Sequence, residues 1–243
     1  MTTAVAFVAH PDDESFAAGG LLAALAAGGA DVFVVAATRG EAGVDLHDGL
    51  TGAALGDRRV GELAVACAAL GIHPPRVLNL RDGALEADAC ATALARHLDA
   101  LTPTLVVTLD RDGAYGHPDH LACTEAVSMV VDDPAVRVLH CAFARGLFAP
   151  LHRRLTRAGL DLRVPEDRLG VSRDAVDAVF PLGRFAETKR RALAAHRSQL
   201  RTPGDPSSFL MPGLIAPLFS QEWYRRDAGP RWPPGPLVPA LIG

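Results

Sequence analysis

Ala9-His10-Pro11-Asp12-Asp13-Glu14 stands close to the N-terminus, between two segments of different character. The run before it, residues 4–8, is apolar and rich in β-branched residues, which predicts a buried strand. Residues 15–29 after it are rich in Ala, Leu and Gly and predict a helix. His10 is therefore expected at the carboxyl end of a first strand, where open α/β sheets bind their ligands.

Three carboxylates crowd the start of this helix, those of Asp12, Asp13 and Glu14. A helix N-terminus favours negative charge, so part of the cluster fits ordinary helix chemistry. That chemistry does not explain the histidine. His10 and Asp13 are three residues apart, close enough to converge on one ion.

A second histidine stretch, Tyr115-Gly116-His117-Pro118-Asp119-His120, follows another apolar run at residues 105–109. Because both His-Pro-Asp units stand past a strand end, we expect them to meet at one site. Together they offer two histidines and a carboxylate with one position left open, which is the ligand set of a catalytic zinc. The same set also suits non-haem iron(II).

The rest of the chain continues to alternate strands and helices. Further strands are predicted at residues 31–37, 76–80, 136–143 and 175–180, the last of them final and at a sheet edge, and further helices at 58–70, 86–101, 119–131, 148–160 and 185–200. This alternation predicts a single-domain α/β fold, a Rossmann-like three-layer sandwich with a mainly parallel sheet. No Gly-x-Gly-x-x-Gly follows the first strand, which argues against dinucleotide binding.

Two segments break the alternation. Residues 43–56 are rich in Gly, Asp and Leu without periodicity, and we weigh a mobile substrate lid against an ordinary surface loop. After residue 201 prolines become frequent, which excludes long helices. We therefore assign residues 1–200 to the main domain and 201–243 to a Pro-rich extension, which packs on that domain or forms a homo-oligomer contact.

Composition narrows the class of protein. The chain has 243 residues, of which 49% are hydrophobic and 21% charged, so it is globular with a sizeable core. A net charge of −4 without a basic block argues against nucleic acid as a partner. No apolar stretch reaches the length of a membrane span, and no basic signal-peptide region precedes the first strand. With four cysteines outside any C-x-x-C pair, we expect buried thiols in a cytoplasmic protein.

The paired histidine motifs resemble those of the PIG-L/LmbE-like family of zinc-dependent N-deacetylases. Three shorter stretches agree with the resemblance: Thr38-Arg39-Gly40-Glu41, Arg59-Val60-Gly61-Glu62-Leu63 and His196-Arg197-Ser198-Gln199. Tyr115 and Arg59, with the Gly-Glu-Leu after it, look most similar to the branch that deacetylates an N-acetylglucosaminyl-inositol in mycothiol formation.

The resemblance implies a role for each matched residue. It makes three side chains the zinc ligands, namely His10, Asp13 and His120. Asp12 is implied as the general base, and His117 as the acid or electrostatic partner of the tetrahedral intermediate. Tyr115 is expected to donate a hydrogen bond to the developing oxyanion, or else to pack on Pro118 as an ordinary loop aromatic.

Two further residues are candidates for substrate contact. Arg59 is expected in the first turn of its helix, where the dipole disfavours a cation, so it either meets an anionic or polyhydroxy ligand or pairs with Asp57 or Glu62. Glu41 follows the second strand, either in an ordinary turn or beside the metal. The resemblance favours substrate contact for both. His196 is left open between stabilising a helix end and touching the site.

The implied function is a zinc-dependent hydrolase that removes an N-acyl (acetyl) group from a small amino-sugar substrate, such as an N-acetylglucosaminyl conjugate. An amidase acting on a mycothiol-type conjugate is a close alternative. An iron(II) oxygenase with the same ligands usually has a double-stranded β-helix, which the strand–helix alternation contradicts. A non-catalytic Rossmann-like sugar- or nucleotide-binding module would be expected to lack a ligand or the base, and none is missing. Acyl group, aglycone and native metal stay open.

Overall fold

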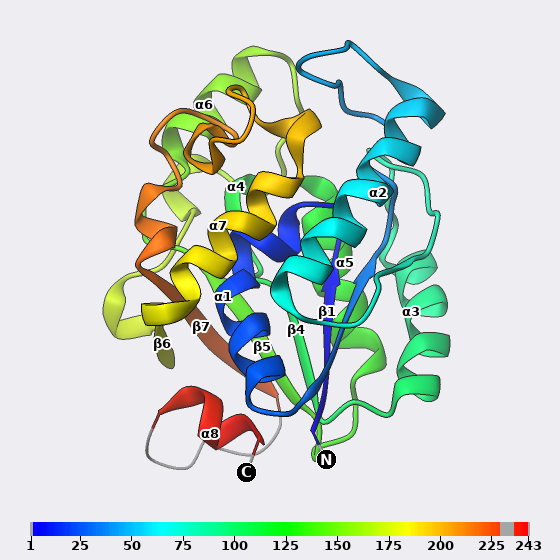
Figure 1. Ribbon diagram of the computed structural model, residues 1–243, viewed down its shortest axis with the longest axis vertical. Helices are drawn as coiled ribbons and strands as arrows, with labels where there is room; N and C mark the ends of the chain where they lie inside the picture. The colour runs from blue at the N-terminus through cyan, green and yellow to red at the C-terminus, as the bar shows by residue number, and fades with distance from the viewer. Residues whose placement is uncertain (1, 229–235, 243) are drawn as a thin grey trace.

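The computed structural model describes residues 2–228 and 236–242. Within them the strands are β1 (Thr3–Val8), β2 (Asp31–Ala36), β3 (Arg76–Val77), β4 (Leu105–Leu109), β5 (Arg137–Ala142), β6 (Ala178–Pro181) and β7 (Gln221–Ala228). These seven form one sheet in the order β3-β2-β1-β4-β5-β7-β6 (Figure 1). Among these described strands, β7 is the one that runs in the direction opposite to the other six.

Helices cover both faces of this sheet. They are α1 (Asp13–Ala27), α2 (Gly52–Leu70), α3 (Ala87–Leu101), α4 (Gly113–Gly116), α5 (Pro118–Val130), α6 (Ala149–Arg157), α7 (Ala186–Ala195) and α8 (Leu237–Ile242). α1, α2 and α7 pack together on one face, and α3 and α5 pack together on the other (Figure 1). The predicted three-layer α/β sandwich is thereby confirmed. None of the helices in the described chain is long and apolar enough to cross a membrane.

Strand β1 is buried on both faces because its neighbours cover it completely. Val5 and Phe7 point into the cluster beneath α3 and α5, whereas Ala4 and Ala6 point into the cluster beneath α1, α2 and α7. Alternate side chains thus enter opposite cores, which is why the strand reads as a continuous apolar run. All four cysteines are free and buried, as expected for unpaired thiols.

The order of the strands creates a crevice beside β1. The chain moves outward from β1 to β2 and β3, and then returns to place β4 on the other side of β1. Connections leaving the carboxyl ends of β1 and β4 therefore diverge to opposite faces, which is the arrangement that opens a ligand-binding crevice in parallel sheets. Both histidine motifs follow these two strands.

Four predicted elements differ from the structure. The helix predicted at residues 185–200 ends at Ala195, because His196 leaves the helical conformation with ψ 56°. α2 begins at Gly52, so it absorbs part of the segment expected to be a loop at 43–56. β3 ends after two residues because Asn79 adopts a positive φ of 56°, which interrupts the extended backbone. The strand at residues 175–180 is at the sheet edge as predicted, but it is not the final one, since β7 follows it.

β7 was not predicted because its inward face carries a carboxylate. Glu222 and Tyr224 are both buried, whereas the neighbouring Trp223 and Arg225 are partly exposed. An acidic residue at a buried position breaks the apolar alternation by which strands are recognised. The division of the chain near residue 200 stays a prediction, but the segment beyond it supplies a strand of the sheet.

Candidate active site

The turn between β1 and α1 holds Asp12 in an unusual conformation, with φ 120° and ψ −27°. Residues other than glycine rarely adopt this region, at a cost of about 1–3 kcal/mol. The Asp12 N–H donates to Glu14 Oε2 (3.0 Å), and the Asp12 carbonyl accepts from the N–H groups of Ser15 (3.0 Å) and Phe16 (3.1 Å). These bonds hold the strained turn in place. Such strain is found mostly at functional sites.

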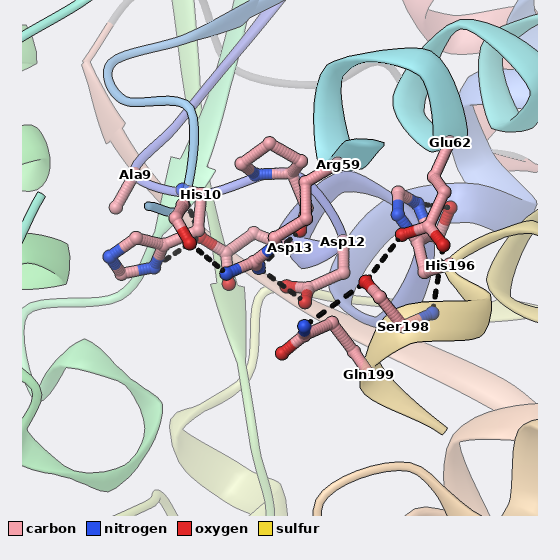
Figure 2. Close-up of polar contacts among 12 residues, drawn as sticks. Ala9, His10, Asp12, Asp13, Arg59, Glu62, His196, Ser198 and Gln199 are labelled. Atoms are coloured by element: carbon pink, nitrogen blue, oxygen red, sulfur yellow. Dashed lines mark hydrogen bonds and ion pairs between the residues drawn. The ribbon is translucent and has the colours of Figure 1, made fainter. Parts of the chain in front are cut away.

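Three side chains converge beside this turn (Figure 2 shows His10 and Asp13). His120 Nε2 lies 3.3 Å from His10 Nδ1 and 3.3 Å from Asp13 Oδ1, and His10 Nδ1 lies 3.5 Å from Asp13 Oδ2. Ligands about 2.0–2.1 Å from a tetrahedral zinc are about 3.3–3.4 Å apart. All three residues are buried. The predicted ligand set is thus close to the spacing that a zinc ion requires.

Hydrogen bonds fix which nitrogen of each histidine faces the convergence point. His120 Nδ1–H donates to the Gly113 carbonyl (3.0 Å), which leaves Nε2 with its lone pair. His10 Nε2 faces Asp82 Oδ1 (3.1 Å) and Asp119 Oδ2 (3.3 Å), which leaves Nδ1 free. Partners of this kind orient metal-binding histidines and raise their basicity. In each ring the nitrogen that faces the convergence point is therefore free to bind a metal.

Asp119 orients His10 through the contact between its Oδ2 and His10 Nε2. Its other bonds come from the N–H groups of Gly83 (2.7 Å) and Leu85 (3.1 Å), so the carboxylate also ties α5 to the segment after β3. Asp82, beside that segment, was not predicted as a site residue from the sequence. It follows a third strand end at the same sheet edge, and that position could have identified it.

The buried carboxyls differ in their electrostatics. Burial alone raises the pKa of Asp13, but the adjacent imidazoles of His120 and His10 hold it well below its ordinary value. Burial raises the pKa of Asp12 to about 6, although the Arg59 guanidinium acts in the opposite direction. Asp13 is thereby kept ionised as a ligand should be, whereas Asp12 is a stronger base than an exposed aspartate.

His117 and Tyr115 lie over the same point. His117 Nδ1 accepts the N–H of Asp119 (3.2 Å) and caps α5, so its proton resides on Nε2. Burial, with the nearby His120 and His10, lowers the pKa of His117 to about 3, which keeps it neutral. The Tyr115 hydroxyl has no hydrogen-bond partner within residues 2–228 and 236–242, and burial raises its pKa well above the usual value. Both side chains are available as hydrogen-bond donors.

Arg59 is buried and reaches the turn rather than solvent (Figure 2). Its Nη2 donates to Asp12 Oδ2 (2.8 Å) and to the Pro11 carbonyl (2.7 Å), and Nη1 donates to the Gly40 carbonyl (2.9 Å). Gly40 has φ 72°, and a side chain there would collide with the guanidinium. Neither expected surface partner of Arg59 is used. The arginine lines the cavity, but its hydrogen bonds hold the Asp12 carboxylate and two backbone carbonyls of the surrounding turns.

Glu41 is placed away from the cavity. Its carboxylate accepts the N–H groups of Arg39 (3.2 Å) and Asp82 (3.0 Å), so both oxygens are engaged with backbone. Through Asp82 it supports the orientation of His10. Its expected contact with substrate finds no geometric support here, and its observed contacts are those of a residue that fixes the loop.

A cavity of about 490 Å³ opens over these groups and would admit a sugar-sized ligand. Its polar floor includes His10, Asp12, Asp13, Asp82, Tyr115 and His117, and its walls include Phe16, Leu46, Leu160, Gln199, Arg201, Phe209 and Leu210. Leu46 belongs to the segment for which a mobile lid was considered. Its N–H donates to the Ser198 carbonyl (2.9 Å), which ties that loop to the turn after α7. The lid interpretation stays a prediction.

Of the short motif at residues 196–199, Gln199 lines the cavity, whereas His196 and Ser198 lie outside the lining, behind the turn (Figure 2). His196 Nε2 is 2.8 Å from Glu14 Oε1, and both side chains are fully buried. Burial alone lowers the pKa of His196, but the Glu14 carboxylate raises it above its ordinary value. Ser198 donates to Glu62 on α2 through its N–H (2.8 Å) and its hydroxyl (2.6 Å).

Comparison with known proteins gives matches over most of the chain. The family model PIG-L, described as GlcNAc-PI de-N-acetylase, matches residues 5–131. A protein of Nakamurella multipartita named 1D-myo-inositol 2-acetamido-2-deoxy-alpha-D-glucopyranoside deacetylase is 35% identical, over 96% of this chain and 92% of its own length.

Two solved structures share the fold. N,N'-diacetylchitobiose deacetylase from Pyrococcus horikoshii superposes with a TM-score of 0.69 at 22% identity, covering 94% of this chain and 84% of its own. The 4-carboxy-2-hydroxymuconate hydratase of Pseudomonas putida gives 0.68 at 16% identity, covering 97% and 99%. The hydratase indicates that this fold supports more than one reaction, so the activity has to be argued from the site.

Proposed function

The chain belongs to the PIG-L family of de-N-acetylases, and from this premise we propose that it is a zinc-dependent hydrolase that removes the acetyl group from an N-acetylglucosaminyl-inositol. The observation that carries the proposal is the convergence of His10, Asp13 and His120 at 3.3–3.5 Å, beside Asp12 in an open cavity. The substrate is taken from the name of the Nakamurella relative.

The three converging side chains would hold the metal. Two imidazoles and one carboxylate suit zinc, and they also suit iron(II), so metal availability contributes to the choice. When bound, zinc would supply Lewis acidity toward water and toward the carbonyl oxygen of the amide.

Asp12 is the group placed to take a proton from the attacking water. Its carboxylate borders the cavity, Arg59 fixes the Oδ2 atom, and burial gives the acid a pKa of about 6. A base is most effective when its pKa lies near the working pH. A proton held at this carboxylate can afterwards move to the leaving nitrogen.

His117 and Tyr115 are the groups placed to stabilise the oxygen of the amide. The neutral His117 presents its Nε2–H to the cavity, because Nδ1 already accepts the N–H of Asp119. As the water oxygen bonds to the carbonyl carbon, negative charge grows on the carbonyl oxygen, and these donors favour it. Cleavage of the C–N bond, with a proton delivered to nitrogen, gives acetate and the free amine.

The finer assignments rest on the same reasoning. An amidase acting on a mycothiol-type conjugate would break the same kind of bond in this cavity and is tested in the same assay. We place the enzyme in the cytoplasm, where a small amino-sugar conjugate would be available. Formation of a homo-oligomer through the segment after residue 200 stays a prediction.

The test is acetate release from a panel of N-acetylglucosaminides and conjugates, with chelator and zinc add-back. We expect release that the chelator stops and zinc restores, highest with the inositol-linked member. His120→Ala should lower the metal content to background and abolish release with it. Metal content that is unchanged in His120→Ala would contradict the ligand assignment, and release that is insensitive to chelator would contradict metal dependence.

A further inference from the structure

The strained conformation of Asp12 needs support from outside the turn. Arg59 restrains the side chain and the preceding carbonyl, but it does not contact the Asp12 N–H. That N–H points to Glu14 Oε2, at 3.0 Å. The orientation of the Asp12 peptide therefore depends on where the Glu14 carboxylate is held.

Glu14 is itself held by a group that comes from the far end of the chain. The second oxygen of Glu14 accepts from Ser15 Oγ (2.5 Å) and lies 2.8 Å from His196 Nε2. Glu14 and His196 are each fully buried. A buried carboxylate requires a compensating cation or hydrogen-bond donor, and the His196 imidazole is the group that lies against Glu14 Oε1.

His196 is placed by the end of α7, which packs against both α1 and α2. Directly after it, Ser198 binds Glu62 on α2 through two hydrogen bonds. The imidazole thus stands on a junction of three helices, so its position against Glu14 is fixed by packing rather than by a flexible loop. Neither Glu14 nor His196 lines the cavity, so neither touches the substrate.

We propose that Glu14 and His196 are a positioning pair, which holds Asp12 in its strained conformation and so aims its carboxylate into the cavity. This inference rests on the proposed function, since Asp12 is the base of that reaction. It also gives the motif at residues 196–199 a physical role. Asp12, which contacts the reacting atoms, is thus positioned by a contact between two residues that are 182 positions apart in the chain.

The test compares His196→Ala with His196→Gln. The alanine variant leaves Glu14 without its imidazole partner, so we expect kcat to fall by about 10²-fold with KM and metal content unchanged. Glutamine can donate an N–H to Glu14 and should restore most of the activity. A kcat within twofold of wild type in His196→Ala, with metal bound, would overturn the proposal, as would a loss that glutamine does not rescue.

A readout independent of activity is the hydrogen exchange of the Asp12 amide in isotopically labelled protein. We expect exchange to be faster in His196→Ala, and close to wild type in His196→Gln. If wild-type protein releases no acetate from any substrate, the proposed function fails, but this exchange measurement still decides whether the pair holds Asp12. Unchanged exchange in the alanine variant would refute the positioning role.

The matched control is Lys189→Met. Lys189 on α7 belongs to another buried pair that packs against α1, with Nζ 2.7 Å from Glu222 Oε1, and it does not line the cavity. The Lys189→Met variant should lower the free energy of unfolding without changing kcat or the hydrogen exchange of the Asp12 amide. If His196→Ala does not fold, Glu14→Gln provides the second variant, because its amide oxygen can accept the Asp12 N–H and its amide nitrogen can donate to Nε2 of a neutral His196 that carries its proton on Nδ1. This variant should keep kcat within about 10-fold of wild type, and a larger loss would count against the geometric role.

Discussion

Two buried pairs, each of a carboxylate and a basic side chain, support helix α1, one at its first turn and one at its middle. At the first turn Glu14 faces His196 and accepts the N–H of Asp12. At the middle Glu222 faces Lys189 and accepts the N–H groups of Gly20 (2.8 Å) and Leu21 (2.9 Å). Both carboxylates are at most 2% exposed.

The two pairs differ in what their hydrogen bonds reach. Glu14 accepts the N–H of Asp12, which lines the cavity. Glu222 instead accepts N–H groups in the middle of α1 and the hydroxyl of Tyr224 (2.8 Å). A buried ion pair therefore does not identify a functional site by itself. What distinguishes the first turn is that its bonds hold a strained backbone beside the converging ligands.

The largest expected effect is at the first turn. Asp12→Asn keeps the size of the side chain but removes the proposed proton acceptor, so kcat should fall by about 10²–10⁴-fold. The metal content should stay at the wild-type level, because Asp12 is not among the three converging ligands. Steady-state kinetics and metal analysis of the same preparation provide the measurement. Near-normal turnover would mean that another group is the base. The Glu14 pair would then differ from the Glu222 pair in position but not in any effect on the reaction.

A smaller effect is expected at Asp119, which contacts the candidate ligand His10 and is not itself one of the three converging side chains. Asp119→Ala removes a carboxylate that orients His10 and ties α5 to the backbone after β3, so metal affinity should fall by about 10–100-fold. Competition with a chromophoric chelator measures this change. Asp99→Ala, an exposed carboxylate on α3, is the control and should bind metal as the wild type does. Equal affinities in both variants would show that His10 is oriented by Asp82 without Asp119.

The smallest effect on activity is expected from the pair at the middle of the helix. Lys189→Met leaves Glu222 buried without its cation, so the free energy of unfolding should fall by about 3–5 kcal/mol. The kcat of the folded enzyme should be unchanged. Denaturant unfolding and kinetics at low temperature separate the two quantities. A loss of kcat comparable to that of His196→Ala would mean that both pairs act on the site through α1.

The sequence predicts the frame of the site because the frame depends on local patterns. Residues 4–8 and 105–109 are apolar runs followed by His-Pro-Asp units, and parallel strands bring their carboxyl ends to one edge. His10, Asp13 and His120 meet there as the motifs indicate. The spacing of His10 and Asp13 is also local, because two residues three apart lie close together whatever the tertiary structure.

Interactions between distant segments could not be predicted in the same way. Arg59 was expected to meet a substrate or a surface acid, and it binds Asp12 and two backbone carbonyls instead. No local pattern encodes that contact, because it depends on how α2 packs on α1. β7 was missed for a related reason, since the buried Glu222 is tolerated only because Lys189 and two backbone N–H groups surround it.

The insertion of β7 between β5 and β6 also has a consequence for biosynthesis. Because β6 pairs with β7 and not with β5, a growing chain on the ribosome leaves the edge of β5 open until residues 221–228 have emerged. Until then Lys189 lacks its carboxylate and the middle of α1 lacks an acceptor. The nascent chain therefore carries an unpaired strand edge of the kind that chaperones protect from aggregation. The sheet is complete only after β7, the last of its strands, has been translated.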